Sequence, residues 1–336
     1  MKLLRKSCIL IITAAVVFSS GCSLESKYNC EFFAMDTVMT INAYGSKSEN
    51  AVKAAQNEIN ELDKLLSVQN KDSEIYKLNH KKSMTVSKDT LSLITRSKEL
   101  YTLTDGAFDI SCEPVSREWG FYSGLENKIP SKEAIENALE GVGAEHIKTE
   151  NSTVTLDENT SLDLGAVAKG YASQKAAETL KENGVTSALM SLGGNVRAVG
   201  SKPDGESWSV AVTDPNDTSK SIGTLKISDK AVVTSGSYQR YFEENGQIYH
   251  HIIDTKTGYP ANSGLKSVTV VSDDDTLADA LSTALFVKGL EKSKELYSKN
   301  SLLFGAVFIT DDNKIYVTDN LNDSFISTQS YEVIDK

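Results

Sequence analysis

The sequence predicts an α+β fold, because helical patterns fill the first third of the chain and a series of short strands follows. The β-rich runs after residue 185 are separated by turn residues rather than by helices, which predicts an antiparallel sheet. A doubly wound α/β fold would instead alternate one helix with each strand. The chain shows no internal repeat or proline-rich linker, so we expect a single domain over residues 31–336.

The first half of the chain carries four segments with apolar residues at helical spacing. They are residues 50–67, 87–105, 131–140 and 166–182. The third segment has Ser131 at its expected N-cap and Gly141 at its expected C-cap, which are residue types preferred at these positions. The fourth is expected to end at Gly184.

The second half of the chain predicts the sheet and two further helices. Its β-rich runs are residues 186–191, 195–200, 208–213, 222–227, 231–235, 247–253 and 266–272. Helical spacing returns at 275–288 and 290–298. A last hairpin is expected from 304–309 and 314–318, with its turn at 311–313.

The N-terminus has the features of a cleaved export signal. Residues 1–21 hold three basic residues, an apolar run of about 11 residues, and small residues before Cys22. A membrane-spanning helix needs about 20 apolar residues, so we do not expect a lasting transmembrane segment. The small residue directly before Cys22 resembles the lipobox of bacterial lipoproteins, although Ser19 stands where Leu is usual. We therefore expect lipidation of Cys22, with ordinary cleavage near Gly21 as the alternative.

The expected mature chain is acidic and begins with a short polar tether, residues 22–30. Loss of the signal leaves 32 Lys and Arg against 46 Asp and Glu, a net charge of −14, which argues against nucleic acid as a partner. Cys30 and Cys112 are too few for a disulfide framework. Acyl chains such as palmitate on Cys22 would hold the exported protein at the outer, or periplasmic, face of the membrane.

The first candidate site is a glycine-rich turn at the start of a helix, residues 162–172. Backbone amides, the helix dipole and Lys169 suit a phosphate group there. A Walker A site is excluded because Tyr171 and Ala172 stand where Lys and Ser or Thr are required. The alternative is a structural turn with a solvated lysine.

The second candidate is an apolar helix, residues 277–286, that carries Asp279 and Thr283 one turn apart. Residues four apart lie on the same helix face. Carboxylate and hydroxyl oxygens suit Mg²⁺, which keeps its other positions for water and substrate phosphates. Alternatively, Thr283 bonds back to a helix carbonyl and Asp279 pairs with a lysine. We favour the metal, because a buried carboxylate is costly without a cation.

Two weaker candidates are a pair of histidines and two polar turns. His250 and His251 lie in an expected strand, so they point to opposite faces and cannot share one metal ion. One of them could act as a base, although a histidine in a strand is more often structural. The turns Gly193-Gly194-Asn195 and 234–240 suit close backbone approach to a ligand, but each is also an ordinary hairpin turn.

Taken in order, these segments resemble the FAD:protein FMN transferases, the ApbE family, over nearly the whole mature chain. Seven motifs carry the resemblance: Met35-Asp36-Thr37, Gly106 to Ile110 with Pro114, Asp163 to Gly170, Gly193-Gly194-Asn195, Ser235-Gly236 with Arg240, His251 to Gly258, and Ala278-Asp279-Ala280. Two positions depart from the family. Asp36 replaces a common Gly, and Thr255 replaces a common Pro.

The resemblance implies a T-fold-like α+β architecture and a role for each site residue. Met35, Ala107, Phe108 and Asp109 would line the flavin pocket, and Asp163, Lys169, Ile252 and the turn Gly193, Gly194 and Asn195 would bind FAD. Mg²⁺ would be bound by the carbonyl of Ala166, the carboxylate of Asp279 and the hydroxyl of Thr283. His251 and Asp254 would be the catalytic pair, although the identity of the base stays open, as do the roles of Tyr238 and Arg240.

The activity implied by the resemblance is Mg²⁺-dependent transfer of FMN from FAD to a threonine of another protein, with release of AMP. The acceptors of this family carry a short Ser/Thr-Gly-Ala/Ser-Thr type sequence, so we expect an exported or membrane-bound redox protein as the partner. Three alternatives stay open. They are an FAD pyrophosphatase that uses water and releases FMN and AMP, a flavin-binding lipoprotein without turnover, and a lipoprotein that binds another solute.

Overall fold

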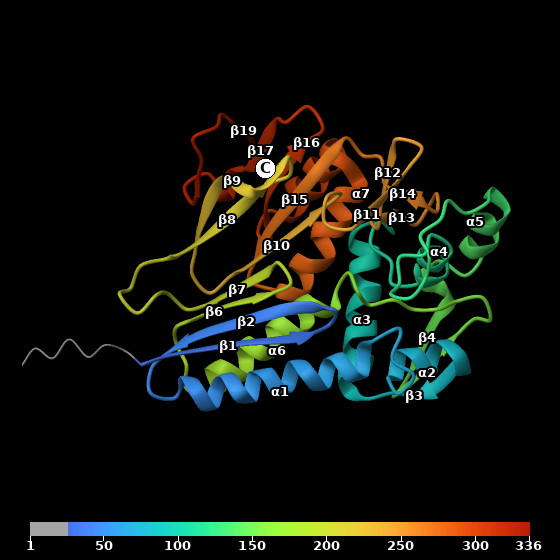
Figure 1. Ribbon diagram of the computed structural model, residues 1–336, viewed down its shortest axis with the longest axis horizontal. Coiled ribbons are helices and arrows are strands. Elements are labelled where there is room, and N and C mark those ends of the chain that lie inside the picture. Colours follow the sequence, from blue (N-terminus) through green and yellow to red (C-terminus); the bar gives the residue numbers. More distant parts are fainter. Residues whose placement is uncertain (1–25) are drawn as a thin grey trace, which may run out of the picture.

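A nine-stranded sheet forms the centre of the computed structural model, which describes residues 26–336 (Figure 1). Neighbouring strands are antiparallel except for the pair β17 and β19 at one edge. Across the sheet the strands are β1 (Lys27–Ala34), β2 (Thr37–Tyr44), β6 (Ala188–Leu192), β7 (Asn195–Val199), β10 (Ala231–Gly236), β15 (Leu265–Ser272), β16 (Gly305–Thr310), β17 (Ile315–Thr318) and β19 (Glu332–Ile334). The expected signal peptide and Cys22 lie outside the described residues.

Helices cover one face of this sheet, and a small second sheet covers the other (Figure 1). The helices are chiefly α1 (Ser48–Leu66), α6 (Ala168–Glu182) and α7 (Asp275–Asn300), and the second sheet has the order β18 (Phe325–Ile326), β9 (Asp217–Ile227), β8 (Trp208–Asp214). Successive strand residues point to opposite faces. On β10, Val233 therefore packs in the helical core, while Val232 packs against the second sheet.

The remaining elements lie to one side of these layers (Figure 1). They are α2 (Glu74–Lys81), β3 (Ser83–Thr85), α3 (Lys88–Leu103), α4 (Glu113–Glu118), α5 (Lys132–Leu139), β4 (Ile147–Glu150) and β5 (Thr153–Leu156), with the hairpins β11 (Tyr241–Glu244) to β12 (Gln247–His250) and β13 (Ile253–Asp254) to β14 (Tyr259–Pro260). Short 3₁₀ turns lie at Ala144–His146 and Asp319–Leu321. No helix of the described chain is both long and apolar enough to cross a membrane.

The α+β class and the expected helices are confirmed. The expected segments 275–288 and 290–298 are the two halves of α7, which is interrupted at Gly289, where φ is 74°. The predicted last hairpin is β16 and β17. The expected glycine C-cap at Gly141 is wrong, because α5 ends at Leu139 with Glu140 as its C-cap, and Gly141 is not among the glycines with a positive φ. Glycine is required at 141 for another reason: a Cβ there would lie 2.0 Å from the carbonyl oxygen of Asn159.

Two expectations about strands need correction. Residues 27–30, expected in the polar tether, begin β1, where exposed Lys27, Asn29 and Glu31 alternate with partly buried residues and gave the segment its polar composition. The single antiparallel sheet expected over 186–272 is divided, because β8 and β9 belong to the second sheet and β12 pairs only with β11. Alternation shows that a strand has one buried face, but not which sheet it joins.

Candidate active site

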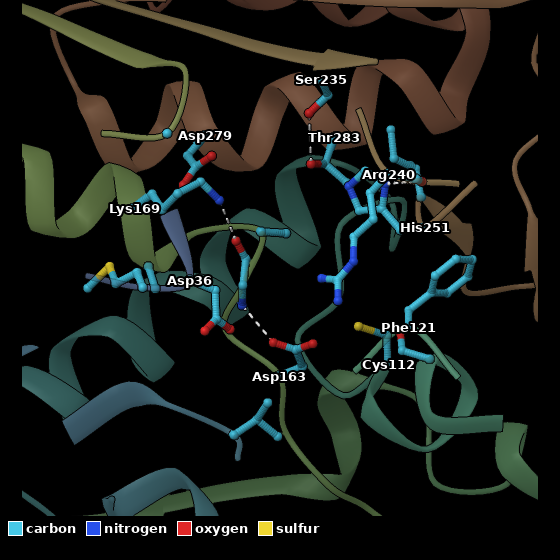
Figure 2. Close-up of a pocket in the computed structure, with 18 of the residues that line it drawn as sticks. Asp36, Cys112, Phe121, Asp163, Lys169, Ser235, Arg240, His251, Asp279 and Thr283 are labelled. Atoms are coloured by element: carbon cyan, nitrogen blue, oxygen red, sulfur yellow. Dashed lines mark hydrogen bonds between the residues drawn. The ribbon is translucent and has the colours of Figure 1, made fainter. Parts of the chain in front are cut away.

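A cavity of about 400 Å³ opens where the ends of several elements meet (Figure 2). It is lined by the turn between β1 and β2, the segment after α1, the start of α6, the end of β10, the loop after β12 and one face of α7. Most of the residues expected at the site line it. They are Met35, Ala107, Phe108, Asp109, Asp163, Ala166, Lys169, Gly193, Asn195, His251, Ile252, Asp279 and Thr283.

Two expected residues do not line the cavity. Gly194 lies in the turn between β6 and β7 beside Gly193 and Asn195, which do line it. Asp254 ends β13, and its carboxylate accepts a hydrogen bond of 3.0 Å from the Lys256 N–H in the turn that follows. Of the expected catalytic pair, His251 therefore lines the cavity and Asp254 does not.

Asp279 is held in place by a glycine at the start of α6. The carboxylate is 4% exposed, and its Oδ2 accepts a hydrogen bond of 2.7 Å from the Gly170 N–H. A Cβ on Gly170 would lie 2.4 Å from the carbonyl oxygen of Asp275 and 2.6 Å from the Cβ of Asp279. Only glycine lets α6 and α7 approach this closely.

The carbonyl of Ala166, just before α6, accepts no backbone hydrogen bond among the described residues. Gly170 lies in the first turn of α6, where a backbone N–H has no carbonyl partner within the helix. Asp279 takes this N–H instead. Ala166, Asp279 and Thr283 all line one cavity. Their carbonyl, carboxylate and hydroxyl oxygens are the kinds of ligand that Mg²⁺ prefers.

The donor set fits a magnesium ion that shares its coordination with a phosphate ligand. No group of three His, Cys, Asp or Glu side chains suited to a metal occurs within residues 26–336, and Asp279 is the one carboxylate in the expected donor set. Mg²⁺ is commonly bound in this way, with one or two carboxylates and the remaining positions taken by water and substrate phosphates. The alternative partners considered from sequence are not found in the described chain. Thr283 bonds to Ser235 at 3.2 Å, and Asp279 pairs with no lysine.

Lys169 and Asp163 lie on the glycine-rich turn, which is stabilised by its own hydrogen bonds. The Lys169 Nζ donates to the Gly165 carbonyl at 3.2 Å, and the Gly165 N–H donates to the Asp163 carboxylate at 2.7 Å (Figure 2). The Tyr122 hydroxyl donates to the other Asp163 oxygen at 2.7 Å. Burial, together with the Asp163 charge, raises the pKa of Tyr122 well above its ordinary value, so this hydroxyl stays a donor.

His251 is held by the backbone of Arg240. The His251 N–H donates to the Arg240 carbonyl at 3.0 Å, and its Nδ1 lies 3.1 Å from the same oxygen. Because a carbonyl can only accept, Nδ1 carries the ring proton and Nε2 is left with a free lone pair. Burial lowers the pKa of His251 to about 4, so the ring is neutral near pH 7 and able to accept a proton. His250 is buried elsewhere, with its Nε2 3.0 Å from the Ala261 carbonyl.

The Arg240 side chain brings a second positive charge into the cavity. Figure 2 shows its guanidinium between Thr283 and Asp163, on the opposite side from Lys169. Arg240 takes part in none of the ion pairs found among residues 26–336. A guanidinium that faces a cavity without a carboxylate partner suits an anionic ligand such as phosphate.

The turn between β1 and β2 packs against the turn between β6 and β7 at another wall of the cavity. Met35 and Asp36 both have left-handed backbone angles, with φ of 48° and 58°, which is costly for residues with side chains. Gly193 faces this hairpin, because a Cβ there would lie 2.5 Å from the Thr37 side chain. The Asp36 carboxylate consequently reaches the cavity, as Figure 2 shows.

Sequence reasoning missed several lining residues, among them Gln69, Cys112, Phe121, Tyr122 and Thr255. Gln69 and Cys112 lie outside the regular helices and strands that periodicity can detect. Phe121 and Tyr122 lie in the irregular segment after α4. Thr255 stands inside a recognised motif, so only its contact with the cavity was unexpected.

Comparison with known proteins gives a consistent result. Residues 35–307 match the sequence profile of the ApbE family. A protein named FAD:protein FMN transferase from Klebsiella pneumoniae is 32% identical over 287 residues, which cover 82% of this chain and 88% of that protein. One of the same name from Treponema pallidum is 31% identical and covers 93% of this chain and 92% of its own.

Solved structures agree with these relatives. The ApbE protein from Thermotoga maritima has a TM-score of 0.82 at 31% identity, over 88% of this chain and 98% of that one. The flavin transferase ApbE from Vibrio cholerae has a TM-score of 0.81 at 27% identity, over 89% of this chain and 99% of its own. With its profile match, its relatives and its fold in agreement over most of its length, the chain belongs to the ApbE family.

Proposed function

We propose that this protein is an FAD:protein FMN transferase, which moves FMN from FAD to a threonine of another protein and releases AMP. The observation that carries the proposal is a single cavity in which the oxygen donors of Ala166, Asp279 and Thr283 lie with the cationic side chains of Lys169 and Arg240. A pyrophosphate held with Mg²⁺ matches both groups. Relatives of that name cover most of this chain.

The remaining lining residues suit the rest of the FAD molecule. A cavity of about 400 Å³ lies within the usual range of about 300–1,000 Å³ for small-molecule sites. Met35 and the segment 107–109 would contact the flavin ring, with Asp163 and Ile252 binding nearby. The turn of Gly193, Gly194 and Asn195 would let the ligand approach the backbone closely.

The reaction is a displacement at the FMN phosphorus. Bound Mg²⁺ would supply neutralisation of charge on the pyrophosphate oxygens. The threonine oxygen forms a bond to phosphorus while the bond to the bridging oxygen breaks, so AMP leaves with that oxygen. His251 would take the threonine proton on Nε2, the nitrogen left free by its bond to the Arg240 carbonyl. Lys169 and Arg240 would hold phosphate oxygens throughout the step.

The proposal also covers the acceptor protein and the cellular location. The acceptor would be an exported or membrane-bound redox protein with a short Ser/Thr-Gly-Ala/Ser-Thr type sequence. Acyl chains on Cys22 would keep the enzyme on the same membrane surface. The support is the N-terminal sequence, which combines a short apolar run with a small residue before Cys22.

The test uses the full chain, purified in detergent, with FAD, Mg²⁺ and an acceptor that carries the threonine sequence. A matched acceptor with valine in place of that threonine is the control. The proposal expects a mass gain equal to FMN on the threonine acceptor alone, with one AMP per transfer. Free FMN and AMP with both acceptors unmodified would instead identify a pyrophosphatase, and intact FAD would identify a binding protein.

A further inference from the structure

Three hydroxyl groups form a chain beside the candidate metal site. The Ser235 Oγ at the end of β10 lies 3.2 Å from the Thr283 Oγ1 and 2.8 Å from the Ser282 Oγ, both on α7. The Ser282 Oγ in turn donates to the Asp279 carbonyl at 2.8 Å. Ser235 and Thr283 line the cavity (Figure 2), whereas Ser282 is fully buried and does not line it.

The direction of these hydrogen bonds follows from counting protons. Each hydroxyl has one proton to donate and can accept through its lone pairs. The Asp279 carbonyl can only accept, so the Ser282 proton is used there. Ser282 must therefore accept from Ser235, and Ser235, having used its proton, must accept from Thr283.

This direction decides what Thr283 can offer to the cavity. Its only proton points toward Ser235, so the lone pairs of its oxygen are the part left for a ligand. A hydroxyl in this state cannot donate to a phosphate oxygen, but it can bind a cation. We propose that Ser235 and Ser282 are positioning residues that keep the Thr283 hydroxyl oriented as a ligand for Mg²⁺.

The proposal rests on the magnesium site of the proposed function and adds two residues that act through Thr283. The hydroxyl chain ends on the backbone carbonyl of Asp279, so it connects the Thr283 side chain to the main chain of the residue that carries the expected carboxylate. Without Ser235, the Thr283 proton would turn toward a carbonyl of its own helix, as threonine commonly does. The lone pairs of its oxygen would then no longer be held toward the cavity.

Two variants separate positioning from direct coordination. Ser235→Ala removes the acceptor of the Thr283 proton, but Ser235 also faces the cavity and could touch an ion itself. Ser282→Ala removes the hydroxyl group of a residue that is 0% exposed and does not line the cavity. The Ser282 hydroxyl reaches the cavity wall through its hydrogen bond to Ser235, so a weaker metal affinity in this variant, with folding unchanged, points to the hydroxyl chain as the cause.

The measurement is Mg²⁺ affinity by isothermal titration calorimetry on the FAD-bound full chain, with Tm recorded as a check on folding. Residues that orient metal ligands typically change affinity by about 10–100-fold when removed. We expect Ser235→Ala to weaken Mg²⁺ binding by about 10-fold and Ser282→Ala by less, with Ser235→Thr close to wild type. The matched control is Thr269→Val, which breaks the 2.8 Å hydroxyl pair of Thr269 and Thr234 on the neighbouring strands, and it should bind Mg²⁺ normally.

The outcomes distinguish this inference from the proposed function. Wild-type Mg²⁺ affinity in Ser235→Ala and Ser282→Ala, with both proteins folded, would overturn the inference whether or not FMN is transferred. A loss that Thr269→Val shares equally would also overturn it, because the effect would then be general loosening of the sheet. If the wild type binds Mg²⁺ and FAD but transfers no FMN, the proposed function fails while the affinity comparison still decides the role of the serines. Failure of the wild type to bind Mg²⁺ would overturn both.

Discussion

Replacing Gly170 by alanine tests how the contact between α6 and α7 places the Asp279 carboxylate. The added Cβ would lie 2.4 Å from the Asp275 carbonyl oxygen and 2.6 Å from the Asp279 Cβ. Both atoms belong to the packed start of α7 and cannot move as a flexible side chain could. The two helices must therefore separate, which stretches the 2.7 Å bond from the Gly170 N–H to Asp279.

The size of the effect can be worked from these contacts. Overpacking of a filled interior costs about 1–3 kcal/mol, and a weakened hydrogen bond to a carboxylate adds up to about 1.5–3 kcal/mol. Alanine returns about 1 kcal/mol through its better helix propensity. We expect a net loss of about 2–3 kcal/mol in the free energy of unfolding, small enough for the protein to stay folded.

The effect on Mg²⁺ should be larger than the effect on stability. Displacing Asp279 from the Ala166 carbonyl and the Thr283 hydroxyl should raise the Mg²⁺ concentration for half-maximal activity by at least about 10-fold. Chemical denaturation and a magnesium titration of FMN transfer measure the two effects. Glu182→Ala, at the exposed far end of α6, is the control for a helix change without this contact. Wild-type stability and magnesium dependence in Gly170→Ala would refute the reasoning.

Three further predictions concern the side chains that face the cavity. Asp279→Asn keeps an oxygen for the Gly170 N–H but loses the negative charge, so turnover should fall by at least about 100-fold with Tm nearly unchanged. Turnover within a few-fold of wild type would exclude Asp279 as the carboxylate that binds the metal. Arg240→Ala should lower kcat/KM for FAD by about 10–100-fold through loss of a charge-assisted hydrogen bond, and Arg240→Lys should recover part of it; equal losses in both would show that charge is not the cause. Because burial lowers the folded pKa of His251 to about 4, below the unfolded value of about 6.5, the unfolded state binds more protons between these values. The stability that neutral His251 contributes should therefore be complete above about pH 6.5 and decrease toward pH 4. His251→Gln should flatten this part of a plot of the free energy of unfolding against pH. An unchanged slope in that variant would contradict the assignment of this pH dependence to His251.

The helices could be predicted from the sequence because their patterns are local. A helix places residues three and four apart on one face, so apolar spacing alone located α1, α3 and both halves of α7. Local geometry also placed Asp279 and Thr283 on one face, and both line the cavity. The interruption of α7 at Gly289 could also be predicted from the sequence, because glycine is unfavourable inside a helix.

Strand partners could not be predicted, because pairing depends on residues far apart in the chain. β10 pairs with β7 and β15, whereas β8 and β9 leave the main sheet and cover its other face. β8 alternates buried and exposed residues, whereas β10 begins with three buried residues. Such patterns show how the faces of a strand are buried, but not which strand it pairs with. The polar surface of β1 likewise concealed a strand whose partner, β2, follows it directly.

The candidate site, too, was predicted in part from the sequence and decided in part by the tertiary structure. Residue types and their order along the chain are enough to indicate Asp163, Lys169, His251 and Asp279. Only the tertiary structure brought Arg240 into the cavity, left Asp254 out of its lining, and supplied Asp279 as the partner of the Gly170 N–H in the first turn of α6. The sequence by itself determined the local helices and the chemical groups available. The arrangement of those groups was decided by contacts between distant segments, since a hydrogen bond such as Gly170 to Asp279 spans 109 positions of the chain.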